Sequence, residues 1–224
     1  MQNKGFLAIW CDIASEHLAD YREWIVKEHI ADRIFSPGFL AARFCIDVTN
    51  PNSHFFLYAT QSKDVFKNPP YLQILNTPSP WTRKIMPLFG AFDRALGEQV
   101  LKIGNGIGPY LLISRLKGPL EINLPLAQLE LSAILQLNEI VSVRLMVLDQ
   151  STIGIKSEEK KMRQGIEGNF NYLIVVEAMS QQAAEQAKDL LPSVLKKVFS
   201  KPLSFDLSIR KMVYSEAPFE GPTV

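Results

Sequence analysis

Cysteine and histidine are scarce in this chain of 224 residues, which contains two cysteines and three histidines. Cys11 and Cys45 are too few for a disulfide scaffold and belong to no Cys-x-x-Cys pair, so a thiolate zinc site is not expected. Both lie in apolar, strand-like segments, where we expect buried, unreactive thiols. His17, His29 and His54 lack the His-Glu-x-x-His spacing. We therefore expect no metal site.

An excess of charge of one sign is also absent, because 24 Lys and Arg residues face 23 Asp and Glu residues. A nucleic-acid-binding protein normally carries a basic stripe, so no nucleic-acid partner is expected. No apolar run approaches the roughly 20 residues of a membrane span. The apolar stretch near the N-terminus is interrupted by Asp12 and lacks a small-residue cleavage site, unlike a signal peptide. We expect a cytoplasmic protein without a membrane partner.

Several glycine-based catalytic motifs are missing. The chain has no Gly-x-Gly-x-x-Gly before a helix, no Walker phosphate loop and no Gly-x-Ser-x-Gly elbow. The glycine-rich segment 104–108 is followed by Pro109, which favours a linker over a phosphate cradle. Hydrophobic residues make up 47% of the chain, so it is apolar enough to fold.

The order of expected elements is similar in the two halves. Apolar and helical periodicities predict strands at 6–13, 39–48, 54–60 and 99–103, a long helix at 17–35, a short helix from about 62, and a helix at 81–96. The second half predicts strands at 110–116, 141–148, 170–179 and 205–214, with helices at 124–140 and 181–199. The first strands begin at Phe6 and Tyr110, 104 residues apart (110 − 6). Each half therefore reads βαββαβ, the ferredoxin-like order.

The expected fold class is α+β, with two tandem ferredoxin-like units: residues 1–104, which include a Pro-rich loop and an extra helix, and residues 105–224. Segments 55–59 and 172–176 are apolar at consecutive positions, which indicates strands buried on both faces. The antiparallel sheets are therefore expected to pack face to face as a pseudo-dimeric α/β barrel. A shared apolar interior would then separate two helix-covered cores.

The richest cluster of polar and aromatic residues lies in the first long helix. His29 and Arg33 are four residues apart and share a helix face. A partly buried histidine is a usable general base near neutral pH. The alternative is a solvated face in which His29 only covers the helix edge.

Other segments allow competing interpretations. Tyr71, Trp81 and the surrounding prolines are typical of an aromatic lid, or Trp81 caps the core while the prolines stiffen a loop. His54 is expected at an exposed strand edge, and the mixed charges of residues 156–163 indicate a solvated loop. The helix at 124–140 has no His, Trp or Arg, so the pocket is expected in the first half unless that helix faces another subunit.

The pattern Tyr21, Trp24, His29, then Pro37-Gly38-Phe39 and Arg43-Phe44, resembles the dimeric α/β-barrel superfamily, and within it EthD-like proteins. Segment 77–83, Thr-Pro-Ser-Pro-Trp-Thr-Arg, resembles a bacterial branch of that group. The chain departs from the pattern at Ala31, where proline is usual. The superfamily contains cofactor-free monooxygenases, isomerases, cyclases, haem enzymes and stress-response proteins, so the resemblance implies a ligand cavity and not a reaction.

The leading hypothesis is a small-molecule enzyme that acts on an apolar or aromatic compound by His-assisted proton transfer or cofactor-free oxidation. No cofactor is expected, although haem ligation by His29 stays open. A non-catalytic ligand-binding or structural protein is the alternative, and a homodimer also stays open. The candidate residues are His29 as acid or base, and Trp24, Arg33, Arg43, Tyr58 and Trp81 for the substrate.

Overall fold

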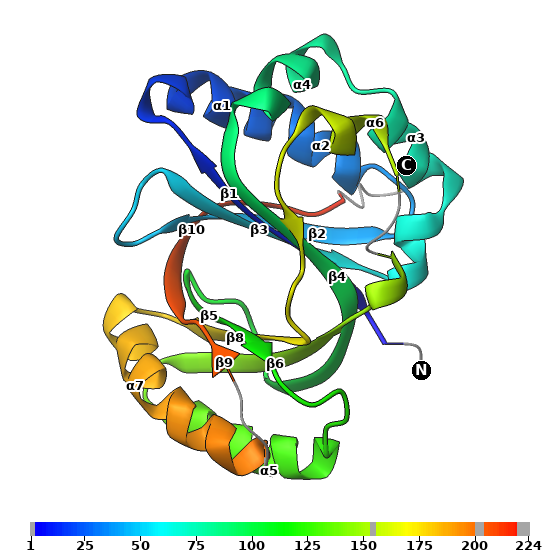
Figure 1. Cartoon of the computed structure of the whole chain (residues 1–224). Coiled ribbons are helices and arrows are strands. Elements are labelled where there is room, and N and C mark those ends of the chain that lie inside the picture. Colours follow the sequence, from blue (N-terminus) through cyan, green and yellow to red (C-terminus); the bar gives the residue numbers. More distant parts are fainter. Residues whose placement is uncertain (1–2, 153–155, 200–203, 219–224) are drawn as a thin grey trace, which may run out of the picture.

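The computed structural model describes residues 3–152, 156–199 and 204–218. Its centre is a closed antiparallel barrel of eight strands (Figure 1). Around the ring these are β1 (Gly5–Ile13), β3 (Ser53–Thr60), β2 (Phe39–Asp47), β10 (Ser208–Glu216), β5 (Tyr110–Lys117), β8 (Tyr172–Ala178), β6 (Ile140–Leu148) and β4 (Phe89–Gly104), and β4 pairs back with β1. The prediction of an α+β barrel is confirmed.

The barrel closes because each half supplies both edges that the other half needs. The first half has the strand order β4-β1-β3-β2, and the second has β10-β5-β8-β6. Strand β2 pairs with β10, and β6 pairs with β4, both antiparallel. Closure leaves no unpaired edge in the ring, and an unpaired edge is where sheets aggregate. Two short strands flank it: β7 (Ile166–Glu167) beside β4, and β9 (Ser204–Phe205) beside β5.

Consecutive apolar residues on one strand serve two different cores. In β3, Phe55 and Leu57 belong to the cluster inside the barrel, whereas Phe56 and Tyr58 belong to the cluster under the first helical layer. In β8, Leu173 and Val175 point inward while Ile174 and Val176 pack under the second helical layer. Successive side chains of a strand point to opposite faces, so burial on both sides requires a continuous apolar run.

Helices cover two separated parts of the barrel wall (Figure 1). The first layer contains η1 (Ser15–His17), α1 (Leu18–Trp24), a π-helical segment η2 (Ile25–His29), α2 (Ile30–Ile34), η3 (Lys63–Lys67), α3 (Pro69–Asn76), α4 (Pro80–Ile85) and η4 (Met86–Leu88). The second contains α5 (Leu124–Leu135) and α7 (Gln181–Val198). The remaining helices, η5 (Gln150–Thr152) and α6 (Glu158–Met162), follow β6, and α6 packs against α3 and η4 of the first layer. Within the described ranges, no helix is long and apolar enough to cross a membrane.

The predicted helix at 81–96 is wrong beyond Ile85, whereas the predicted strand at 99–103 is confirmed as the last part of a longer strand, β4. Helix α4 stops at Ile85, and one strand of 16 residues runs from Phe89 to Gly104. Pro87 has no amide hydrogen to continue a helix. The strand pairs with β1 on one side and with β6 on the other. These pairings with segments distant in sequence stabilise the strand, and local periodicity does not reveal them. Gly97 permits the close approach, since a Cβ there would lie 2.0 Å from the carbonyl oxygen of Val147.

Candidate active site

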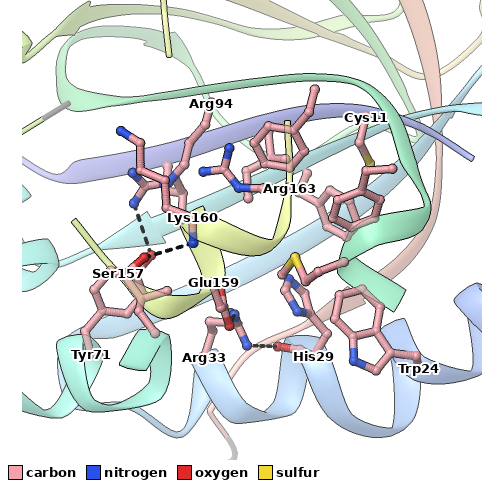
Figure 2. A pocket seen from close by; sticks show the side chains of 17 residues that line it. Cys11, Trp24, His29, Arg33, Tyr71, Arg94, Ser157, Glu159, Lys160 and Arg163 are labelled. Atoms are coloured by element: carbon pink, nitrogen blue, oxygen red, sulfur yellow. Dashed lines mark hydrogen bonds and ion pairs between the residues drawn. The ribbon is translucent and has the colours of Figure 1, made fainter. Parts of the chain in front are cut away.

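A cavity lies between the first helical layer and the outer face of the barrel wall. Its empty space is about 630 Å³, the opening to solvent included. The barrel supplies an apolar floor that includes Leu7, Ile9, Phe56 and Phe92. Helices α1, η2 and α2 form one side, and residues of α6 and its flanks form another (Figure 2).

His29 reaches this cavity from the π-helical segment that interrupts the first helix. Single π-helical turns inside α-helices frequently occur at functional sites. The side chain is only 5% exposed, and its Nδ1 atom has no hydrogen-bond partner among the described residues. Burial, and then the charge of Arg33, hold the pKa of His29 well below its ordinary value. The imidazole is therefore neutral near pH 7, the form in which one ring nitrogen keeps a free lone pair.

Trp24 is held in place by the segment that precedes α4. Its Nε1 atom donates hydrogen bonds to Thr82 Oγ1 and Glu28 Oε1, each at 3.1 Å. The hydroxyl of Ser79 donates to the same carboxylate oxygen and accepts from the backbone amide of Thr82, which caps α4. The indole lies 4.1 Å from the His29 ring, centroid to centroid, at an interplanar angle of 43°. Thr82 therefore fixes the surface against which His29 packs.

Arg33 is paired with Glu159 of α6, and both side chains are nearly buried, at 4% and 9% exposure. The Nη1 atom of Arg33 also donates to the carbonyl oxygen of His29 at 3.4 Å. The interpretation of residues 156–163 as a solvated loop is thus wrong. Ser157 caps a short helix whose buried Glu159 faces the first half. A residue of the second half therefore helps to build a cavity that we expected from the first half alone.

Two further arginines line the cavity opposite the helix that carries His29 (Figure 2). Arg94 Nη2 donates to the hydroxyl of Tyr71 at 3.3 Å, and Arg94 Nη1 lies 3.5 Å from Glu167 Oε2. Arg163 Nη2 donates to Glu167 Oε1 at 2.9 Å. The guanidinium of Arg163 also lies 3.8 Å from the centroid of the Phe92 ring.

Cations outnumber carboxylates at this cavity. The lining contains four cationic side chains and one carboxylate: Arg33, Arg94, Lys160, Arg163 and Glu159. The carboxylate of Glu167 lies behind Arg94 and Arg163. Among the buried groups, three arginines face two carboxylates, so one positive charge is left over. An apolar cavity with a surplus of buried cations favours a ligand that combines an apolar body with an anionic group.

The structure brings some of the predicted site residues together and separates others. His29, Trp24 and Arg33 line one cavity. Arg43 points into the barrel and pairs with Glu177, with Nη1 and Oε1 2.8 Å apart. Outside the lining, the ring of Tyr58 packs against Phe39 and Phe56. Trp81 also lies outside it, where its Nε1 donates to Asp20 Oδ1 at 3.0 Å.

We expected His54 at an exposed strand edge, but this prediction is wrong, because the side chain is fully buried. Its ring stacks on Phe44 at 5.3 Å, and both ring nitrogens lack partners among the described residues. Burial, helped by the charges of Arg22 and Arg210, lowers the pKa of His54 to about 4. The prediction of buried thiols is confirmed for Cys11 and Cys45.

Sequence reasoning missed Glu159, Arg94 and Arg163. Arg94 lay in a segment assigned to a helix, and the other two lay in the charged run assigned to solvent. An alternation of Phe92, Arg94 and Leu96 with small or polar residues would have indicated a strand. For Glu159 no local signal exists, because its partner lies 126 residues away. Across the described ranges, no group of His, Cys, Asp and Glu is placed to hold a metal ion.

No protein-family model matches the sequence, and no curated protein matches it. Solved structures do match. A proposed monooxygenase of Lactobacillus acidophilus superposes with a TM-score of 0.59 and 8% identity, covering 96% of this chain and 97% of that one. An anthrone oxidase-like protein gives 0.58 and 11%, covering 97% and 94%. A proposed chlorite dismutase gives 0.57 and 10%, covering 95% and 96%. With its eight-stranded closed barrel and two helical layers, the chain has the fold of the dimeric α/β-barrel superfamily.

Proposed function

We propose that this protein is a small-molecule enzyme in which His29 removes a proton from an apolar, aromatic compound that carries an anionic group. The observation that supports it best is a neutral, buried imidazole in an apolar cavity with surplus cations. Arg94 and Arg163 replace the predicted Arg33 and Arg43 as the holders of the anionic group. Arg33 is committed to Glu159, and Arg43 lies elsewhere.

Each residue has a distinct part in this proposal. Trp24 and Phe56 contact the aromatic body, and the cations stabilise the negative charge that develops when the proton leaves. Water is largely excluded by the apolar floor, which strengthens these electrostatic interactions. The names of the monooxygenase and anthrone oxidase-like neighbours fit the same first step, followed by oxidation with dioxygen.

Hydrogen–deuterium exchange tests the proton transfer without requiring the oxidation. An anthrone that bears a carboxylate combines an acidic C–H group with the required anionic group, and its exchange in D₂O can be followed by NMR with and without the protein. We expect the protein to accelerate the exchange, and the His29→Gln variant to lose about 10²–10⁴-fold of that acceleration, the usual contribution of a general base. His17→Gln is the matched control. Equal acceleration by His29→Gln and by the unmodified protein would overturn the role of His29.

One observation favours the second candidate, a non-catalytic ligand-binding protein. A catalytic histidine is usually oriented by a hydrogen-bond acceptor, whereas Nδ1 of His29 has no such partner among the described residues. This candidate predicts stabilisation by ligand without turnover, about 2.7 kcal/mol at a ligand concentration of 100 Kd. A thermal-shift screen with aromatic acids, quinones and haem, followed by product analysis, separates the two.

A further inference from the structure

One end of the barrel holds a second concentration of positive charge, away from the His29 cavity. Side chains of Arg43, Arg144 and Glu177 follow the inward-pointing positions of β2, β6 and β8, beside the interior residues Cys45, Met146 and Val175. They close the end of the apolar interior. A pocket opens above them, with Lys4, Lys102 and Ile107 at its rim and Met146 in its floor.

The carboxylate at this end is already saturated. Glu177 is fully buried, and its Oε1 accepts from Arg43 Nη1 and Arg144 Nε, both at 2.8 Å. Its Oε2 accepts from the backbone amide of Gly108 at 2.9 Å. Glu177 therefore fixes the two guanidinium groups and neutralises one positive charge.

Three positive charges remain after that pairing. Arg43, Arg144, Lys4 and Lys102 line the pocket, and no carboxylate does. The Nη1 atom of Arg144 donates a hydrogen bond to the side-chain amide oxygen of Gln99 at 3.0 Å. In the described part of the chain, Nε and Nη2 of Arg43 and the amine of Lys102 make no hydrogen bond or ion pair. Burial, followed by the charge of Arg144, lowers the pKa of Lys102, and Lys4 and Arg43 add to the effect.

The opposite end of the barrel shows that such a surplus is not required for closure. There Arg115 pairs with Asp93, at 3.0 Å, and with Asp206. Arg210 lies 3.3 Å from Asp47. Each of these arginines has its own carboxylate, so that end is balanced. The end around Glu177 is cationic although the same architecture permits neutral closure.

We propose that the pocket formed by Arg43, Arg144 and Lys102 at this end of the barrel binds an oxyanion, either a carboxylate or a phosphate. Guanidinium groups fixed by a buried carboxylate are preorganised donors for such groups. At the rim, Lys102 supplies a charge that has no partner among the described residues. The apolar Met146 and Ile107 allow the oxyanion to carry a short apolar chain.

Methionine methyl NMR distinguishes this pocket from the His29 cavity. Met146 lies in the pocket at the barrel end, and Met86 lines the His29 cavity. The full chain is labelled with ¹³C-methyl methionine, and Met146→Leu and Met86→Leu variants assign the two signals. The probes are inorganic phosphate, acetate and hexanoate, which separate a phosphate source from a carboxylate source and measure the value of an apolar chain.

We expect at least one probe to shift the Met146 signal in a saturable way while the Met86 signal stays unchanged. The Lys102→Gln variant should weaken that binding about 10-fold or more, the loss expected for one hydrogen bond to a charged group. Lys102→Arg should retain it, and Lys196→Gln, which removes an equal charge from the exposed face of α7, should leave it unchanged. Absence of a saturable Met146 shift for all three probes, a shift of Met86 instead, or equal weakening by Lys102→Gln and Lys196→Gln would overturn the proposal.

Discussion

Arg33 of α2 and Glu159 of α6 form a nearly buried ion pair across 126 residues of sequence. The pair joins the helix that carries His29 to a segment of the second half. Because Arg33 also donates to the carbonyl oxygen of His29, the pair connects α6 to the candidate base itself. The cavity therefore depends on both halves of the chain.

Removing one partner of that pair should be costly. Glu159→Ala leaves the charge of Arg33 buried without compensation, and we expect a loss of about 3–5 kcal/mol in the free energy of unfolding. Urea denaturation measures it. The double variant Arg33→Met/Glu159→Leu replaces the pair with apolar contacts and should recover most of the loss. A cost below about 1 kcal/mol for Glu159→Ala would show that the pair is not buried in solution.

Stability should fall as the pH falls below about 6.5, the unfolded pKa of histidine. His29 and His54 have lowered pKa values in the folded state, the latter about 4. Between the unfolded and the folded pKa, the unfolded chain binds more protons than the folded chain. The free energy of unfolding therefore rises with pH, by up to about 1.4 kcal/mol per pH unit for each histidine. Urea titrations at pH 7, 6 and 5 measure the slope. His54→Phe should remove about half of it, and an unchanged slope in that variant would contradict the burial of His54.

The surplus cations should make the cavity prefer anionic aromatic ligands. We expect 2-naphthoate to bind more tightly than its neutral analogue 2-naphthylmethanol. Arg94→Met should weaken 2-naphthoate about 10-fold or more, the worth of a hydrogen bond to a charged group, and should leave the neutral analogue unaffected. Calorimetric titration gives both affinities. Equal losses for the two ligands would indicate a packing defect and not a lost charge.

Two glycines of β4 should respond differently to alanine. A Cβ at Gly97 would lie 2.0 Å from the carbonyl oxygen of Val147, whereas one at Gly90 would lie 3.6 Å from that of Asp12, an ordinary contact. Gly97→Ala should therefore destabilise by about 1–3 kcal/mol, as overpacking does, and Gly90→Ala should change little. Thermal or urea unfolding compares them. Similar stabilities for the two variants would contradict the close pairing of β4 with β6.

Much of the architecture was readable from local patterns. The continuous apolar runs around Phe56 and Ile174 predicted strands buried on two sides, and the closed barrel with its two helical layers explains them. The Pro-rich segment was expected to form a lid or a stiffened loop, and it forms two short helices, α3 and α4, with a gap between them. Residues 99–103 of β4 were predicted as a strand, but its first part, residues 89–96, was assigned to a helix because its pairing partners are distant in sequence.

The candidate site was only partly readable. His29, Trp24 and Arg33 shared a motif within one helix, so their common location followed from helical spacing. The π-helical turn that aims His29 into the cavity has no clear local signature in this segment. Arg94 and Glu159 reach the cavity from other elements, so neither could be assigned to it by spacing along the chain.

By itself, the sequence determined the alternation of strands and helices, the two-sided burial of the strands and the residue types available for chemistry, because these depend on local periodicity and side-chain properties. Only the tertiary structure decided which charges meet. It buried Glu159 against Arg33, moved Arg43 to the end of the barrel beside Glu177, and left surplus cations in two separate pockets. Pairing of buried charges depends on distances of a few ångströms between segments far apart in sequence, and the closure of the barrel sets those distances.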